Sequence, residues 1–371
     1  MKKLLSVMLM VVLCFAILAG CEKNEESSRN SDIQAVNEEN QTETSQETAS
    51  DESGSVEQSR EEAESSSEDI TPSAKIDINV AALKGPTAMG MVKIMEDSDK
   101  DLAANNYNFT IAGAPDEITA GIIKGDFDIA AIPCNLAAVL YNKSEGGLAV
   151  AGINTLGVLY VVESGEEINS VGDLKGKTIY STGKGTTPEY TLNYLLSSYG
   201  IDPTKDVTIE YKSEATEVAA VLGEKSDAIA MLPQPYVTTV MMNNKNIRIA
   251  LDIAKEWDKA SANKSTVVTG VIVVNKKFLE NNKEAVDTFL SEYETSEQYV
   301  NSNTEEASVL IEKFNIFKAA AAKTALPYCN ITSIQGEEMK AKISGYLETL
   351  LEQNPDTVGG KLPDDGFYYM K

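Results

Sequence analysis

The chain has 371 residues, 42% of them hydrophobic, and a formal net charge of −25 at neutral pH. This acidic balance argues against nucleic acid as a partner. The sequence also contains no histidine, the commonest general base and transition-metal ligand near neutral pH, so it favours a non-enzyme without a metal or cofactor.

The first twenty residues are typical of a secretory signal peptide. Lys2 and Lys3 precede an apolar run over residues 4–18, which is too short for a comfortable membrane span. The run leads into Leu-Ala-Gly and then Cys21, which resembles a bacterial lipobox, where the cysteine is acylated and becomes the mature N-terminus. We expect lipidation at Cys21 and a location on the extracytoplasmic face of the cell membrane. A plain signal peptide with a chance cysteine is the alternative.

The segment that follows predicts a disordered tether. Residues 22–74 carry sixteen acidic and three basic side chains and almost no large apolar residue. Such a segment buries too little apolar surface to offset its conformational entropy. A flexible coil of about 50 residues spans roughly 40 Å, and charge repulsion extends it further. Residues 21–74 therefore read as a lipidated N-terminus and an acidic spacer.

Residues 75–371 alternate short apolar runs with helical stretches, which predicts an α/β fold. After Asn275 the chain becomes nearly all helical, so we expect the last strand to return to the first sheet and the final helices to wrap that lobe. The predicted strands are Ile76–Leu83, Phe109–Ala112, Ile129–Ile132, Leu148–Asn154, Val158–Glu163, Thr178–Ser181, Val207–Lys212, Ala228–Leu232, Ile247–Ala250 and Val267–Asn275.

Two strand–loop–helix units stand out. The first strand leads into Lys84-Gly85-Pro86-Thr87, with Thr87 as the expected N-cap of a helix over 88–97. The strand at 178–181 leads into Gly183-Lys184-Gly185-Thr186-Thr187-Pro188, where Thr187 is a suitable N-cap. Glycine loops and helix N-termini suit an anion or a carbonyl-rich ligand, while an ordinary capped turn is the alternative. Together the units suggest two lobes with helix ends facing one another.

Two proline-containing turns follow strands at corresponding places. One is Ile132-Pro133-Cys134-Asn135 and the other is Leu232-Pro233-Gln234-Pro235-Tyr236. An open α/β sheet binds ligands just beyond strand carboxyl ends. The side chains of Asn135 and Gln234 carry both donors and acceptors, so they are candidates for reading a polar organic ligand.

Arginine and cysteine are sparse in residues 75–371. Arg248 is the single arginine there, and we expect it at the surface rather than clamping a carboxylate. An anionic ligand would therefore depend on helix N-termini, Thr hydroxyls and lysines; a neutral or aromatic heterocycle is the alternative. Trp257, Tyr236 and Tyr328 could stack on such a ring, although core packing is the expected role. The cysteines there form no disulfide framework, and one Cys134–Cys329 bridge is the less favoured option.

Several motifs carry a family resemblance. They are Leu83-Lys84-Gly85-Pro86-Thr87-Ala88-Met89-Gly90-Met91, Asp173-Leu174-Lys175-Gly176-Lys177, the glycine loop at 183–188, Gln234-Pro235-Tyr236-Val237, and the tail at 359–369. With these motifs, residues 75–371 resemble the solute-binding proteins of ABC importers, in the nitrate/taurine/sulfonate/thiamine-precursor-like group. The resemblance implies a type II periplasmic-binding fold: two lobes, each a mixed sheet flanked by helices, joined by two crossing hinge strands, with a ligand held between them.

The resemblance implies a domain order and a role. Residues 1–20 would be the signal peptide, 75–156 plus 269–371 lobe 1, and 157–268 lobe 2. The expected function is capture of a small organic or anionic solute for ABC permease subunits, by a chain that is a monomer. An enzyme on the same fold, of the menaquinone- or pyrimidine-pathway type, is the alternative, and a surface sensor or adhesion module is a third reading. The expected ligand contacts are Lys84, Gly85, Thr87, Met89, Gly90, Asn135, Thr155, Lys184, Gly185, Thr186, Thr187, Gln234 and Tyr328.

Overall fold

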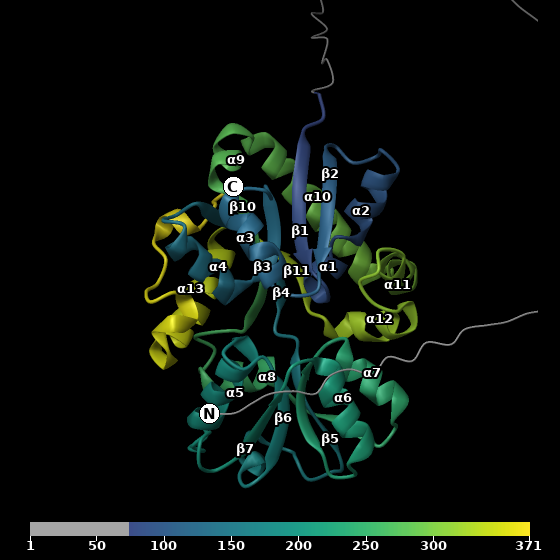
Figure 1. Cartoon of the computed structure of the whole chain (residues 1–371), viewed down its shortest axis with the longest axis vertical. Coiled ribbons are helices and arrows are strands. Elements are labelled where there is room, and N and C mark those ends of the chain that lie inside the picture. The colour runs from purple at the N-terminus through teal and green to yellow at the C-terminus, as the bar shows by residue number, and fades with distance from the viewer. Residues whose placement is uncertain (1–73) are drawn as a thin grey trace, which may run out of the picture. The chain divides into compact units, whose positions relative to one another are not determined.

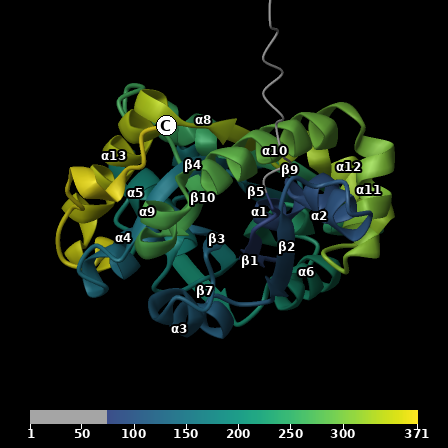
Figure 2. The ribbon, with the colours of Figure 1, turned by 90° about the horizontal axis from the view of Figure 1, so that it is seen from above.

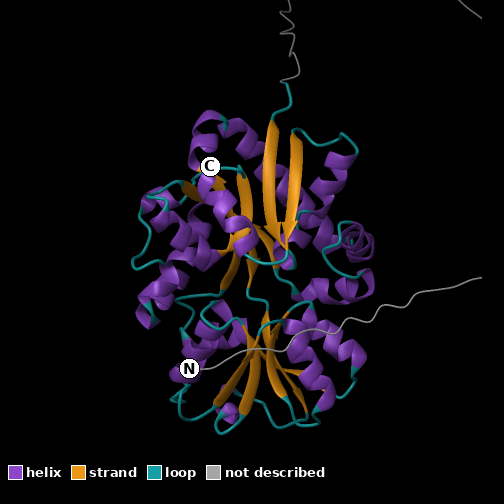
Figure 3. Ribbon diagram, in the orientation of Figure 1, coloured by secondary structure: helices purple, strands orange, loops and turns teal. Residues whose placement is uncertain are grey.

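The computed structural model describes residues 74–371, which fold into two α/β lobes (Figures 1 and 3). The predicted signal peptide, Cys21 and the tether lie outside the described residues. Lobe 1 is built on a six-stranded sheet with the order β11-β4-β10-β3-β1-β2. Its strands are β1 (Asp77–Leu83), β2 (Asn106–Ala112), β3 (Ile129–Pro133), β4 (Leu148–Leu156), β10 (Val268–Asn275) and β11 (Ile331–Ile334).

Lobe 2 is built on a five-stranded sheet with the order β7-β6-β8-β5-β9. It holds the middle of the chain and lies below lobe 1 in the view of Figure 1. Its strands are β5 (Leu159–Ser164), β6 (Thr178–Thr182), β7 (Thr208–Lys212), β8 (Ile229–Pro233) and β9 (Ile247–Asp252).

The two sheets share one topology. In lobe 1, β1 pairs in parallel with β2 and β3, and β10 runs antiparallel between β3 and β4. In lobe 2, β6 pairs in parallel with β7 and β8, and β5 runs antiparallel between β8 and β9. Each antiparallel strand enters its sheet directly after the chain has left the other lobe. The two crossing strands expected from the sequence are therefore β5 and β10.

Helices flank both sheets. Figure 2 shows α4 and α13 on one side of the lobe-1 sheet, with α2, α10, α11 and α12 on the other. Lobe 1 contains α1 (Pro86–Met89), α2 (Val92–Asp99), α3 (Asp116–Lys124), α4 (Cys134–Lys143), α9 (Lys276–Asn281), α10 (Lys283–Ser302), α11 (Thr304–Lys313), α12 (Ala319–Ala325) and α13 (Gly336–Gln353). Lobe 2 contains α5 (Thr187–Ser198), α6 (Ala215–Glu224), α7 (Tyr236–Asn243) and α8 (Ile253–Ala260). Short 3-10 turns are η1 (Val171–Leu174), η2 (Leu326–Tyr328), η3 (Pro355–Val358) and η4 (Asp365–Phe367). None of the helices in 74–371 is both long and apolar enough to cross a membrane.

An apolar joint connects the lobes at one edge. Trp257 of α8 lies 5.6 Å from Tyr346 of α13 and 4.1 Å from Tyr194 of α5, measured between ring centroids. Trp257 and Tyr346 are fully buried. Aromatic contacts of this kind add to the free energy of burial, so this edge resists separation of the lobes.

The ten predicted strands are all present, and β11 is the strand that the sequence did not indicate. The helix expected over 88–97 is divided into α1 and α2. Neither expected N-cap is correct. Gly85 precedes α1 because Pro86 takes the first helical position, and the Thr87 hydroxyl donates back to the Leu83 carbonyl at 2.7 Å. In lobe 2, Thr186 takes the N-cap position and Thr187 is already helical.

Candidate functional site

A cleft lies between the lobes, beyond the carboxyl ends of strands from both sheets. It consists of a larger cavity of ≈ 570 Å³ and a smaller one of ≈ 240 Å³. Pro133, at the end of β3, and Pro233, at the end of β8, line both cavities, as do Val158 and Thr269. These volumes suit a small organic ligand.

The two cavities differ in character. The larger one is mainly apolar, with Pro115, Leu136, Val139, Leu159, Pro188 and Tyr190 in its wall. The smaller one contains Lys84, Gly85, Thr87, Thr155, Gln234 and Tyr236, together with Phe317. Tyr236 and Phe317 contact each other edge to face, with their ring centroids 5.6 Å apart. The polar candidates are thus divided, with Lys84, Thr87, Thr155 and Gln234 at the smaller end and Asn135, Thr186 and Thr187 at the larger one.

Gln234 lines the smaller cavity and also the neighbouring groove of ≈ 260 Å³, and its side chain carries an unpartnered donor. Its side chain is only 2% exposed. Oε1 accepts hydrogen bonds from the backbone N–H of Thr238 at 3.2 Å and from the Thr238 hydroxyl at 2.9 Å. A backbone N–H can only donate, so it fixes which end of the amide is oxygen. Nε2 is buried without a hydrogen-bond partner among the described residues.

Two threonine hydroxyls share this property. Oγ1 of Thr155, on β4, and Oγ1 of Thr269, on β10, are buried and without partners among the described residues. Neighbouring Asn154 donates from Nδ2 to the Thr87 carbonyl at 3.2 Å and so connects β4 to α1. A Cβ at Gly270 would lie 2.4 Å from Asn154 Oδ1, so only glycine allows this packing. Buried polar groups without partners are costly in a folded protein and therefore indicate a site for a polar ligand.

The glycine loop of lobe 2 is largely occupied by its own side chains. The backbone N–H of Gly185 donates to the carboxylate of Glu189, and the Tyr190 hydroxyl donates to the Gly185 carbonyl at 3.0 Å. The Thr186 hydroxyl donates to the Gly183 carbonyl at 2.7 Å. The loop expected from the sequence to receive an anion thus already holds a carboxylate.

One hydrogen bond crosses the cleft between predicted residues. The Thr187 hydroxyl of α5 donates to Oδ1 of Asn135 on α4 at 2.9 Å. Asn135 also donates to the Thr357 carbonyl at 3.4 Å. Elsewhere along the seam, the Tyr160 hydroxyl of lobe 2 donates to the Tyr328 carbonyl of lobe 1 at 3.0 Å. Contacts of this kind stabilise the lobes in proximity.

The cleft walls carry few charges. Lys84 is the cation among the lining residues of the two cavities and Asp356 is the anion, and both are exposed. Burial raises the pKa of Tyr190, and the carboxylates of Glu189 and Asp356 raise it further. Burial and the Glu214 carboxylate act in the same direction on the pKa of Tyr236. Both phenols therefore stay protonated, and negative charge prevails near Tyr190.

Most of the predicted contact residues meet at the cleft. Lys84, Gly85, Thr87, Asn135, Thr155, Gly185, Thr186, Thr187 and Gln234 line one cavity or the other. Four do not. Met89 is fully buried in the lobe-1 core, and Gly90 is packed so closely that an added Cβ would lie 2.8 Å from the Tyr293 hydroxyl. Lys184 is exposed and absent from the wall. Tyr328 is 47% exposed and lines a separate groove of ≈ 260 Å³ beside Gln234.

Sequence reasoning missed several lining residues. Pro133 and Pro233 belong to the paired strand-end turns and Thr269 to a crossing strand, so a signal for them was present in the sequence. Asp356 and Thr357 belong to η3, more than two hundred residues after Asn135. Nothing local marks η3 as the turn that returns to the cleft.

Other sequence expectations have mixed outcomes. Trp257 belongs to the core, as expected, and its indole donates to the Ser265 hydroxyl at 3.1 Å. Arg248 is not simply a surface residue, because it pairs with the carboxylate of Glu163, which is 3% exposed, and donates to the Ile168 carbonyl at 2.7 Å. Cys134 and Cys329 are buried and free, so the bridge between them is absent.

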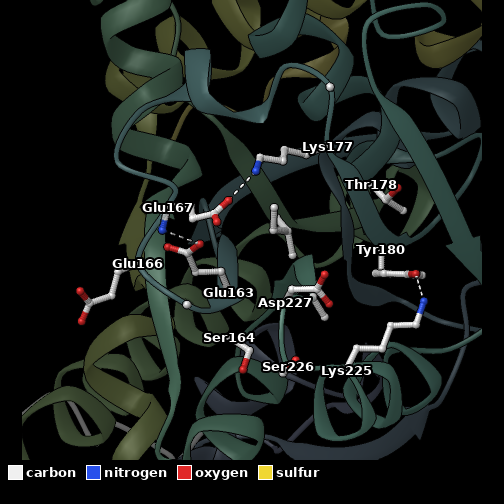
Figure 4. Close-up of a pocket in the computed structure, with 14 residues that line it drawn as sticks. Glu163, Ser164, Glu166, Glu167, Lys177, Thr178, Tyr180, Lys225, Ser226 and Asp227 are labelled. Atoms are coloured by element: carbon white, nitrogen blue, oxygen red, sulfur yellow. Dashed lines mark hydrogen bonds and ion pairs between the residues drawn. The ribbon is translucent and has the colours of Figure 1, made fainter.

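A further cavity of ≈ 590 Å³ lies at the opposite edge of the lobe-2 sheet (Figure 4). It is bordered by the starts of β6 and β8, at Thr178 and Ile229, whereas the cleft lies beyond their ends. Its charged groups are largely paired within the wall. Figure 4 shows the Lys177–Glu167 ion pair, at 2.5 Å, and the Lys225–Tyr180 hydrogen bond. Across residues 74–371, no cluster of His, Cys, Asp and Glu could hold a metal ion.

Comparison with known proteins identifies the fold. Residues 146–307 match the family model described as NMT1/THI5 like. A crystal structure of an ABC transporter from Parabacteroides distasonis is similar, with a TM-score of 0.68 and 25% identity over 79% of this chain and 99% of that one. The periplasmic aliphatic sulphonate binding protein SsuA from Escherichia coli gives 0.65 and 15%, over 79% and 92%. The ligand-binding component of an ABC-type import system from Staphylococcus aureus gives 0.61 and 12%, over 80% and 97%. No curated protein sequence matches.

The fold is therefore that of the periplasmic binding proteins, in the two-lobed arrangement with two crossing strands expected from the sequence. The resemblance to the solute-binding proteins of ABC importers is likewise confirmed as a similarity: part of the chain matches the NMT1/THI5-like model, and the two-lobed part is similar to an ABC transporter protein.

Proposed function

We propose that the chain is the extracytoplasmic solute-binding component of an ABC importer, which captures a small solute between its lobes and delivers it to permease subunits. One observation carries this proposal. Unpartnered polar atoms from both lobes, at Thr155, Thr269 and Gln234, occur on residues that line one cavity of the cleft. A solute that enters between the lobes can form hydrogen bonds with the unpartnered atoms of both lobes at once. Similarity to an ABC transporter protein and to a periplasmic sulphonate binding protein supports the same role.

Closure follows from the connectivity. Residues 75–156 and 269–371 form the first lobe and 157–268 the second, with hinges near 154–157 and 268–270. The aromatic joint at Trp257 and Tyr346 stays packed during the movement. The cleft edge at Asn135 and Thr187 opens and closes. Glycine at 157 and 270 is required by close packing, since a Cβ at Gly157 would lie 2.6 Å from that of Ala254.

Residues outside the described range complete the proposal. A lipid on Cys21 anchors the chain, the acidic spacer holds the lobes off the membrane, and the protein acts as a monomer. Mass spectrometry of the mature N-terminus tests the anchor. An acylated Cys21 supports it, and a mature chain that begins with another, unmodified residue contradicts it.

Solution scattering and thermal unfolding test the function. We expect a metabolite that binds in the cleft to reduce the radius of gyration and to raise the melting temperature with increasing ligand concentration. A broad metabolite screen without any thermal shift, combined with scattering that never changes, would count against a solute-binding role. The cleft offers no specific observation in favour of the enzyme alternative, and we do not adopt it.

A further inference from the structure

The wall of the cleft limits the chemistry of its ligand. Relatives named for sulphonates take an anionic group. In this chain, the glycine loop before α5 is occupied by a carboxylate, the larger cavity has a second carboxylate in its wall, and Lys84 is the one cation that lines either cavity. The inference below rests on the proposed function and concerns the same site.

The loop before α5 already holds a negative charge. The backbone N–H of Gly185 donates to the carboxylate of Glu189, and the same carboxylate raises the pKa of Tyr190. An anion at this loop would have to displace Glu189 or lie beside it. Like charges at contact distance repel, so the loop disfavours an anion.

The opposite wall of the cleft adds a second carboxylate. Asp356, on η3 of lobe 1, faces the larger cavity and raises the pKa of Tyr190 from across the cleft. The larger cavity has no lysine or arginine in its wall. The rest of its wall consists of apolar side chains and uncharged polar ones such as Asn135 and Thr187, so this end suits an uncharged or positively charged body rather than a sulfonate or a carboxylate.

The smaller cavity is lined by residues that carry unpartnered hydrogen-bond donors. Gln234 Nε2 is a donor and has no acceptor capacity, and the Thr238 backbone fixes its orientation. The hydroxyls of Thr155 and Thr269 can donate as well, and Lys84 lies in the same wall. A ligand that ends here must present a hydrogen-bond acceptor, such as an amide, a ketone or a ring nitrogen.

We infer that the cleft selects an organic solute without negative charge, with a hydrogen-bond acceptor directed at Gln234, Thr155 and Thr269 and an apolar or cationic body in the larger cavity. Gln234 and Glu189 act as the residues that determine specificity. The amide supplies the required donor, and the carboxylate excludes anions from the α5 loop.

A charge-matched panel tests the inference on the purified full chain. The probes are nicotinamide with nicotinate, benzamide with benzoate, and benzenesulfonamide with benzenesulfonate, together with taurine, nitrate and a broad set of neutral and cationic metabolites. Binding is read by thermal shift and then by calorimetry. We expect the stabilising compounds to be uncharged or cationic acceptors, and each neutral member to bind more tightly than its anionic partner.

Substitutions locate the effect. Gln234→Glu keeps the acceptor for Thr238 but replaces the donor, so binding of a neutral hit should weaken by about five- to a hundredfold. Gln353→Glu, the same change at an exposed position of α13, should leave binding unchanged. Glu189→Gln should improve binding of the anionic probes. Melting temperatures without ligand show whether each variant is folded.

The outcomes separate the two proposals. Stabilisation mainly by nitrate, taurine or the sulfonates would leave the solute-binding role intact and overturn this inference. A neutral hit that Gln234→Glu binds as tightly as the native chain does would also overturn it. Failure of every compound, anionic or neutral, would count against the proposed function itself.

Discussion

The hydrogen bond between Thr187 and Asn135 allows closure of the two lobes to be tested by substitution. It joins α5 of lobe 2 to α4 of lobe 1 at 2.9 Å in a partly buried position. A bond of this type contributes about 0.5–1.5 kcal/mol net. If ligand affinity depends on closure, Thr187→Val should raise the dissociation constant by about two- to thirteenfold. Scattering of the ligand-free variant should shift toward a more extended form.

A matched control and a second substitution make this test decisive. Thr208→Val places the same change on an exposed position of β7 and should alter neither affinity nor scattering. Asn135→Ala should cost less in the Thr187→Val background than in the native chain, because the shared bond is already lost. If Thr187→Val behaves like Thr208→Val, or if the two cleft substitutions are fully additive, the bond does not contribute to closure.

Three further expectations can be checked separately. Gly183→Ala should weaken ligand binding more than Gly185→Ala does, as measured by calorimetry on the two variants. Both positions have positive φ, but an added Cβ at Gly183 would lie 2.6 Å from the Thr186 hydroxyl oxygen, whereas the space at Gly185 is open. Arg248→Met should lower the free energy of unfolding in urea by about 2–4 kcal/mol, because it leaves a buried carboxylate unpaired while the guanidinium itself is partly exposed. Lys323→Met, in an exposed ion pair, should lower it by less than about 1 kcal/mol, and equal losses would contradict this expectation. A tyrosine hydroxyl and a backbone amide hold the pKa of Asp364 below its ordinary value of 3.8. Its contribution to stability is therefore complete above pH 3.8 and is lost as the pH falls through the lowered pKa. Asp364→Asn should flatten the acid limb of a stability–pH profile, and an unchanged limb would refute this.

The fold was largely predictable because its elements have strong local signals. Apolar runs bounded by glycine and proline identified ten strands, and the change to helices after Asn275 indicated that the final segment returns to lobe 1. The four-residue strand β11 was missed because its burial is set by pairing with β4. Lys84, Asn135 and Gln234 were identified because they follow strands whose carboxyl ends face the cleft.

The rest of the site depends on long-range packing. Met89 lies in the same motif as Thr87, but its position on α1 directs its side chain into the lobe-1 core, where it is fully buried. The glycine loop has the sequence of an anion site, and only the fold shows that Glu189 already occupies the Gly185 amide. Asp356 reaches the cleft through the packing of η3 against α4, which no local pattern records.

Hydrogen–deuterium exchange with and without a ligand from the screen tests the central claim most directly. The account predicts that protection increases together in segments 133–136, 154–158, 183–190 and 233–236, because a solute between the lobes orders both walls. Protection confined to one lobe, or centred on the far cavity around Glu163 and Lys177, would contradict it.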